Sequence, residues 1–228
     1  MYGSGAGEGF WHLLTDADRA ALSALGRNST FLPGSAICGE GEPTTHVFIL
    51  VAGWVKVLSV TSEGHEELLA LRGHGDIIGE IAGETDGYRV ASVRAVDQVR
   101  SLIVGHGRFS SFLGSHPEAD RAYHRVLARR WSDSDAELRR RSRTSGSQRL
   151  AGVLLDLAVH FGVARTSGIE IAELLSQDEL ASLAGTSRAT VARALATWRE
   201  RGIIRSGQRF IAITDEQRLR HIASWLTR

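Results

Sequence analysis

The sequence contains little cysteine, methionine or proline, and it has no long apolar run. Its 228 residues include one cysteine, Cys38. A single thiol excludes an intramolecular disulfide, and it excludes an iron–sulfur cluster, which needs several thiolates. No apolar run approaches the roughly 18 residues of a membrane-spanning helix, and no basic segment followed by an apolar one predicts secretion. We therefore expect a cytoplasmic protein.

The charge of the chain is nearly balanced overall but not along its length. The net charge of +1 favours no class of partner. Residues 1–117 carry 8 basic and 13 acidic side chains, whereas residues 118–228 carry 19 and 13. The basic excess predicts that the C-terminal half binds a polyanion such as nucleic acid. A chain of this length is also long enough for two compact domains.

The first half of the chain predicts a compact β domain. Between Gly34 and Leu113, short β-rich runs are separated by glycines, with turn signals about every 10 residues. Candidate strands are Val47–Val51, Trp54–Val60 and Glu67–Leu71. Strands and turns at this spacing favour a small antiparallel barrel or roll, and the helices predicted further on make the chain α+β.

A long helix is predicted after Pro117, because neither glycine nor proline interrupts residues Glu118–Arg143. One stripe of this helix repeats in steps of four, four, three and four residues, at Tyr123, Leu127, Trp131, Ser134 and Leu138. A helix between two domains does not bury such a stripe alone, so we expect a partner helix from a second subunit. The alternative is a helix that packs on its own β domain.

The segment Leu175–Ile213 predicts two short helices joined by a tight turn. Ser176 and Glu179 have the spacing of a capping box, which satisfies backbone amides at the start of a helix. Gly185 lies where the turn needs a positive φ, and Ser187 follows as the cap of the second helix. Two helices joined in this way are typical of a DNA-reading unit.

The second helix has the side chains of a DNA reader near its N-terminus, the end that meets base edges in helix-turn-helix proteins. Its outer face carries Ser187, Arg188, Ala189 and Arg193. A wing is predicted behind the helix from two β-rich runs, Gly202–Arg205 and Arg209–Ile213. The alternative is a pair of amphipathic helices packed for stability, with arginines that only keep the outer face solvated.

The sequence SQDELASLAGTSRATVARAL, at residues 176–195, resembles the helix-turn-helix of the Crp-Fnr superfamily of bacterial transcription regulators. The resemblance extends over residues 10–213. It implies a β-roll (jelly roll) of the cyclic-nucleotide-binding type, with an N-terminal helix, over residues 1–117. It further implies a dimerisation helix and hinge over residues 118–144, and a winged helix-turn-helix domain with a C-terminal helix over residues 145–228. The expected protein is a homodimer that binds a two-fold symmetric operator in double-stranded DNA and has RNA polymerase as a further partner.

The chemistry of its side chains predicts roles for the second of the two helices, the recognition helix. Arg188 and Arg193 would each grip a guanine base, because a guanidinium donates to guanine O6 and N7 together. Ala189 stands where family members use a glutamate that accepts from cytosine, so we expect a different operator preference. The expected phosphate contacts are Thr186, Ser187 and Thr190.

A second motif resembles the phosphate-binding cassette of cyclic-nucleotide-binding domains. It consists of Gly79, Glu80, Ile81 and Ala82, followed by Arg89, Val90 and Ala91. By that resemblance Arg89 would pair with the cyclic phosphate, and Glu80 would accept from the ribose 2′-hydroxyl. Val90 departs from the serine of bacterial family members. Ser134 and Asp135 occupy the positions that touch the purine across the dimer. The implied effector is a cyclic nucleotide, with cyclic AMP, cyclic GMP and a cyclic dinucleotide left open, and no covalently bound cofactor is implied.

Two other functions stay open. The first is a regulator of the same fold that binds DNA constitutively, with a vestigial pocket in which Glu80 and Arg89 form an internal ion pair. The second is a protein-interaction module that binds no DNA. Enzymatic function is not expected, because the sequence has no P-loop and no nucleophile signature of serine, histidine and acid. No metal site is expected either, because the nine histidines are scattered without ligand spacing.

Overall fold

The computed structural model describes residues 9–43, 46–84, 87–172, 175–207 and 210–223. The chain forms two compact units, Met1–Ser134 and Asp135–Arg228. The division falls inside the long helix α5 (Pro117–Arg143), which the sequence predicted as a separate segment. None of the helices in these described ranges is both long and apolar enough to cross a lipid bilayer.

The first unit is built on two four-stranded antiparallel sheets, with strand orders β1-β8-β3-β6 and β2-β7-β4-β5. The strands are β1 (Arg27–Phe31), β2 (Ala36–Cys38), β3 (His46–Ala52), β4 (Val55–Val60), β5 (Glu66–Arg72), β6 (Ile77–Ile78), β7 (Ser92–Ala95) and β8 (Val99–Gly105). The antiparallel roll expected from the spacing of short strands and glycines is thus confirmed. The chain passes several times between the two sheets, with only β4 and β5 consecutive in one of them, and no local pattern in the sequence contains that order.

Strand β3 shows why the roll is stable, because it is buried on both faces. Successive side chains of a strand point to opposite faces. Val47 and Ile49 therefore pack into a core shared with the helices, whereas Phe48 and Leu50 pack into a second core with residues of both sheets. A continuous apolar run is the sequence pattern that such a strand requires.

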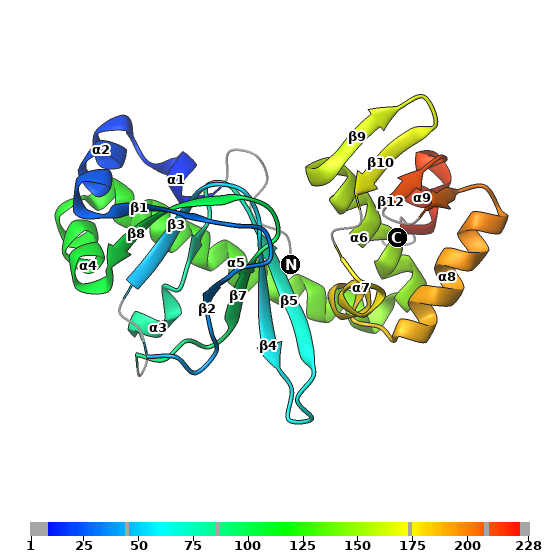
Figure 1. Ribbon diagram of the computed structural model, residues 1–228, viewed down its shortest axis with the longest axis horizontal. Helices are drawn as coiled ribbons and strands as arrows, with labels where there is room; N and C mark the ends of the chain where they lie inside the picture. The colour runs from blue at the N-terminus through cyan, green and yellow to red at the C-terminus, as the bar shows by residue number, and fades with distance from the viewer. Residues whose placement is uncertain (1–8, 44–45, 85–86, 173–174, 208–209, 224–228) are drawn as a thin grey trace. The chain divides into compact units, whose positions relative to one another are not determined.

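Short helices cover one part of the roll in Figure 1. They are α1 (Phe10–Leu13), α2 (Asp16–Leu25) and α4 (His106–Ser115), while the further short helix α3 (Ile81–Glu84) follows β6. Phe10, Phe109 and Tyr123 meet edge to face, with ring centroids 5.5 to 6.2 Å apart. This aromatic cluster fixes α1, α4 and the first turns of α5 to one another.

The predicted stripe on α5 divides into a buried and an exposed part. Tyr123 is 5% exposed and belongs to the core of the first unit, and Leu127 packs against that core. Trp131 and Leu138, further along the helix, are 77% and 66% exposed. The second half of the stripe is therefore left uncovered within a single chain.

In its described residues, the second unit combines the end of α5 and several shorter helices with a sheet of order β11-β12-β10-β9. Its elements are α6 (Gly146–Phe161), β9 (Gly162–Arg165), β10 (Gly168–Ala172), α7 (Gln177–Ala184), α8 (Arg188–Glu200), β11 (Ile204–Ser206), β12 (Phe210–Ile213) and α9 (Glu216–Ala223). Its buried side chains include Leu150 and Leu154 of α6, Val191 of α8, Ile204 of β11 and Leu219 of α9. The edge strand β9 has no buried residue. Figure 1 shows α7 and α8 as consecutive helices of this unit.

Candidate DNA-reading face and effector pocket

The two helices of the DNA-reading unit begin and end where the sequence predicted. The Ser176 hydroxyl accepts from the Glu179 amide, and the Glu179 carboxylate accepts from the Ser176 amide, which completes the capping box of α7. Gly185 ends α7 in the left-handed region, with φ of 55°. The Ser187 hydroxyl accepts from the Thr190 amide and caps α8.

The outer face of α8 is exposed at the residues expected to read bases. Val191 and Leu195 are buried and anchor the opposite face of the helix. Ser187, Arg188, Ala189 and Arg193 are exposed. Thr186 and Thr190 are half-buried, and a Cβ at Gly146 would collide with the Thr186 side chain. The start of α6 thus packs closely against the start of α8.

The wing is formed by β11 and β12, which pair antiparallel. Ile204 lies opposite Ile213 at one end of the pairing, and Ser206 lies opposite Ile211 at the other. The sheet continues through β10, which pairs with the other edge of β12. Residues 208 and 209, at the predicted turn and at the start of the second predicted run, lie outside the described part of the chain.

The cassette lines a pocket of about 230 Å³ in the first unit, somewhat smaller than the lower end of the range for small-molecule sites, about 300 Å³. All seven cassette residues lie on its wall, namely Gly79, Glu80, Ile81, Ala82, Arg89, Val90 and Ala91. Three guanidinium groups, of Arg72, Arg89 and Arg130, face one carboxylate, of Glu80, among the described lining residues. The pocket therefore carries net positive charge. Burial, and then the charge of Arg130, lower the pKa of Arg72 to about 10, so it stays protonated at neutral pH.

Arg89 lines the pocket and is buried, with 4% of its surface exposed. Its Nη1 donates to the Gly79 carbonyl at 3.0 Å and its Nη2 to the His46 carbonyl at 2.8 Å. The guanidinium carbon lies 5.2 Å from the centre of the Phe48 ring. Gly79 has φ of 80°, and a Cβ there would overlap the Arg89 guanidinium. Only glycine satisfies both conditions without strain.

Glu80 is held from the long helix. Arg130 of α5 forms an ion pair with Glu80, with Nη1 and Oε1 2.6 Å apart, and its Nη2 donates to the Ile77 carbonyl at 2.7 Å. The same Nη2 lies 3.5 Å from Oδ1 of Asp76, a carboxylate that is 1% exposed. Arg130 therefore joins α5 to both ends of the segment Asp76–Glu80, which leads into the cassette.

The predicted purine contacts on α5 have other partners in the structure. The Ser134 hydroxyl donates to the Arg130 carbonyl at 2.9 Å. The Asp135 carboxylate lies 3.6 Å from Arg139 Nη1, one turn further along the helix. Both residues are exposed. No group of three or more histidine, cysteine, aspartate or glutamate side chains within the described ranges is placed to hold a metal ion.

Comparison with known proteins agrees with this geometry. Residues 29–116 match the cyclic nucleotide-binding domain, and residues 148–222 match the Crp-like helix-turn-helix domain. A CRP-like cAMP-activated global transcriptional regulator of Mycobacterium tuberculosis is 33% identical over 200 residues, which cover 88% of this chain and 89% of that protein. The chain belongs to the Crp-Fnr family of transcription regulators.

Two further relatives of this Crp-Fnr chain show how far the likeness reaches. A cyclic AMP receptor protein of Thermus thermophilus is 30% identical over 83% of this chain and 85% of its own length. The structure of the c-di-GMP responsive regulator CLP of Xanthomonas campestris superposes with a TM-score of 0.75 over 87% of this chain and 99% of that one. At 18% identity, the second likeness concerns the fold alone.

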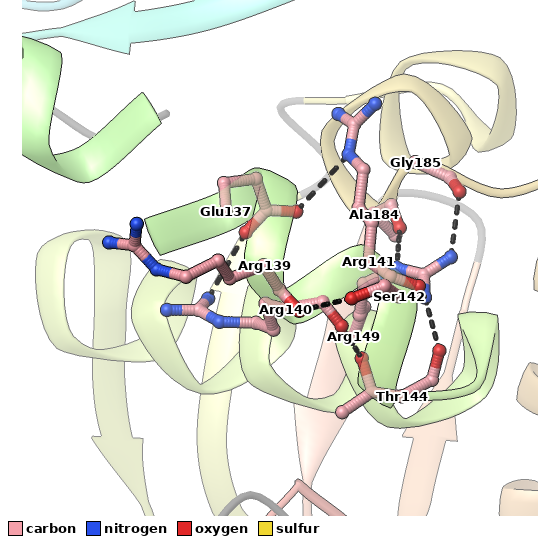
Figure 2. Close-up of polar contacts among 9 residues, drawn as sticks. All are labelled: Glu137, Arg139, Arg140, Arg141, Ser142, Thr144, Arg149, Ala184 and Gly185. Carbon is pink, nitrogen blue, oxygen red and sulfur yellow. Dashed lines mark hydrogen bonds and ion pairs between the residues drawn. The ribbon is translucent and has the colours of Figure 1, made fainter. Parts of the chain in front are cut away.

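In this Crp-Fnr chain, a cluster of arginines fastens the helix-turn-helix turn to the end of α5, as Figure 2 shows. Arg149 donates to the Ala184 carbonyl at 2.7 Å and to the Gly185 carbonyl at 2.8 Å, and it also donates to the Thr144 carbonyl. The last carbonyls of a helix have no partner within the helix. At the end of α7, backbone amides of the turn donate to Ala181 and Ser182, and Arg149 satisfies the carbonyls of Ala184 and Gly185. Burial lowers the pKa of Arg149.

The same cluster contains a buried carboxylate, drawn beside the arginines in Figure 2. Glu137 is 6% exposed, and its carboxylate lies 3.4 Å from Arg140 Nη1 and 3.4 Å from Arg141 Nε. A Cβ on Gly185 would lie 2.7 Å from Arg141 Nε. The close approach of Arg141 and the positive φ both require glycine at the turn.

Several of these residues were not predicted from the sequence. Arg130 lies four residues before Ser134, on the same face of α5, and this spacing could have placed it near the predicted effector contacts. Because it stands in a run of charged residues, however, the sequence pattern predicts a solvated side chain. Arg149 gives no local signal for its contact with the turn, because Ala184 and Gly185 lie 35 and 36 positions further along the chain.

Proposed function

We propose that this protein is a homodimer that reads a two-fold symmetric DNA operator under the control of a small anionic effector. The observation that carries the proposal is the exposed face of α8, where Arg188 and Arg193 project from a helix whose opposite face is buried. In such a dimer, two recognition helices enter successive major grooves about 10 base pairs apart.

The outer face of α8 carries side chains suited to contact bases and others suited to contact phosphates. Arg188 and Arg193 have the length and the paired donors to bind guanine O6 and N7. Ser187 and Thr190 hold hydroxyl groups near the N-terminus of α8, where the helix dipole favours a phosphate, and Thr186 lies beside them. Ala189 offers no acceptor to cytosine, so the operator is expected to differ from that of regulators with a glutamate there.

The pocket suits an anion with an apolar part. Three arginines supply the positive charge, and Ile81 and Val90, which are 47% and 54% exposed, supply apolar surface on the wall. A cyclic nucleotide meets both requirements, because it combines a phosphate with a purine ring. The relative from Mycobacterium tuberculosis is named as cAMP-activated, which favours cyclic AMP as the first candidate.

The pairing of Glu80 with Arg130 suggests how the effector acts. A ribose hydroxyl that donates to Glu80 changes the environment of an ion pair that ends on α5. The effector then binds two arrangements of α5 with different affinity, which is the condition for allosteric control. The end of α5 is in turn fastened to the helix-turn-helix turn by Arg149.

A second candidate is a regulator that binds DNA without an effector. It is favoured by the fact that Arg89 and Glu80 both have partners within the chain. Arg89 binds two backbone carbonyls and Glu80 binds Arg130. The internal pair that seals the cassette would then be Glu80 with Arg130.

The proposed DNA reading is tested by titrating the full-length protein with two duplexes. One duplex is selected from a randomised pool by the protein itself, and the other is a scrambled sequence of equal length. We expect the selected duplex to bind about 1,000-fold more tightly, and the affinity for both to fall steeply with salt because bound phosphates release counterions. Equal affinity for the two duplexes, or an affinity independent of salt, would overturn the proposal and favour a protein-interaction module.

A further inference from the structure

The two base-reading candidates on α8, Arg188 and Arg193, have different surroundings. Arg188, the first residue of α8, forms an ion pair with Asp178, the second residue of α7, and Arg188 Nη1 lies 3.5 Å from Asp178 Oδ2. For Arg193, the described residues provide neither an ion pair nor a hydrogen bond to the side chain. Among the described residues, the ion pair with Asp178 therefore distinguishes Arg188 from Arg193.

The pair between Arg188 and Asp178 contributes little to folding. Its side chains are 68% and 64% exposed, and exposed ion pairs add little stability because water screens them. The start of α7 is already satisfied by the capping box of Ser176 and Glu179. Asp178 also adds a negative charge to the surface that would approach DNA. A function in recognition explains this better than a function in stability.

We propose that Asp178 is a specificity-determining residue that positions Arg188 for one base of the operator. This inference rests on the proposed DNA reading, and it adds Asp178 as a residue that acts through the base-reading Arg188. A guanidinium has five N–H donors in a planar fork. When Asp178 takes Nη1, the remaining donors stay available for guanine O6 and N7. The carboxylate limits the directions in which the Arg188 side chain points.

Asp178 also acts against the wrong sequences. Its carboxylate repels the phosphate backbone, and that repulsion is offset only while the Arg188 guanidinium remains beside it. On a sequence without the matching guanine, Arg188 gains no base contact that would compensate for the remaining repulsion between Asp178 and the phosphates. Specificity is a difference between two affinities, and a repulsive group raises it as effectively as an attractive one.

The substitution Asp178→Asn in the full-length protein tests this inference. Affinities are measured for the selected duplex and the scrambled duplex at one salt concentration. We expect the scrambled duplex to bind about twofold to threefold more tightly, because one repelling charge is gone. The ratio of the two affinities is expected to fall about five- to tenfold, because Arg188 is no longer held. Selection from a randomised pool should relax at the symmetric pair of positions that Arg188→Ala also relaxes.

A double-mutant cycle separates positioning from a general change in charge. In the Arg188→Ala background, Asp178→Asn should leave the affinity ratio unchanged within about twofold, because no guanidinium remains to be held. Glu200→Gln is the matched control, because it removes the same charge from the exposed last residue of α8. Asp178→Glu should restore most of the ratio. Thermal unfolding of each variant excludes a loss of folded protein.

Three results would overturn the inference. An equal rise in affinity for both duplexes would mean that Asp178 only repels DNA. A larger rise for the selected duplex would mean that Asp178 keeps Arg188 away from the base. Unchanged affinities for both duplexes in Asp178→Asn would mean that Arg188 needs no partner. All three leave the proposed function intact, because that proposal fails only when the wild-type protein itself does not discriminate between the duplexes.

Discussion

At the scale of single residues, the proposed binding of an effector is expected to depend on Arg89. Calorimetry of the wild-type protein with cyclic AMP, cyclic GMP and cyclic di-GMP should give heat with at least one of them. Arg89→Ala should weaken that binding roughly thirtyfold, because a hydrogen-bonded charge contributes about 2 kcal/mol. Arg94→Ala is the control, because Arg94 pairs with Glu66 in the same unit and is not among the lining residues described for the pocket.

The result also separates the two candidate functions. Absence of heat with all three nucleotides would favour the regulator that needs no effector. Because Arg89 is buried and supports two carbonyls, thermal unfolding of Arg89→Ala must first show a folded protein. Arg89→Lys retains the charge but not the planar fork, so its affinity should lie between those of the wild type and the alanine variant.

The sequence predicted individual residues well where their partners are near in the chain. The capping pair of Ser176 with Glu179 spans three residues, and Ser187 caps the helix that begins directly after it; both are confirmed. Arg130 and Asp178 could not be assigned in this way. Their partners lie 50 and 10 positions away on other elements, and only the folded chain brings them together.

At the scale of elements, Arg149 is expected to hold α7 to the hinge. Arg149→Met retains much of the aliphatic packing but removes the donors that satisfy the Ala184 and Gly185 carbonyls. Leaving such groups without partners costs about 1 to 3 kcal/mol in the free energy of unfolding. Urea unfolding of the variant should show this loss as a lower transition midpoint for the second unit.

The matched control for Arg149 is Arg220→Met on α9. Arg220 forms an ion pair with Glu216 one turn away, and both side chains are largely exposed. Its loss should change the free energy of unfolding by less than about 0.5 kcal/mol. Equal effects of the two substitutions would contradict the assigned function of Arg149, because they would show that its carbonyl contacts are no stronger than a surface pair.

Elements were predicted most reliably in the second unit, because caps, a turn glycine and apolar spacing all coincide there. For the first unit, the sequence predicted strands and the fold class but not the order of the strands in the sheets. β1 pairs with β8, and β2 with β7, across intervals of more than 50 residues. Such pairings depend on how two sheets close over a shared core. That closure is a property of the whole unit and leaves no periodic signal.

At the scale of the whole molecule, the proposed symmetric reading depends on an association that one chain does not show. α5 leaves Trp131 and Leu138 uncovered at positions seven residues apart, which is the heptad spacing of a helix that packs on a second helix. A tryptophan buries about 150 to 250 Å² when covered. Two such stripes facing each other would supply the hydrophobic core of a dimer interface and fix the distance between the two recognition helices.

Trp131→Glu tests this arrangement, because the side chain is exposed in the single chain and its replacement should leave each fold intact. At about 25 cal/mol per Å² of buried surface, losing two tryptophans from the interface should raise the dimer dissociation constant at least a hundredfold. Sedimentation should then report a monomer at micromolar concentration. Affinity for a full operator should fall far more than affinity for a half-site, because only the dimer engages both halves at once. Val159→Glu alters a side chain of similar exposure, 74%, on α6 and should remain dimeric. A Trp131→Glu protein that stays dimeric would refute the α5 seam, and one that loses half-site binding equally would point to damage within the second unit instead.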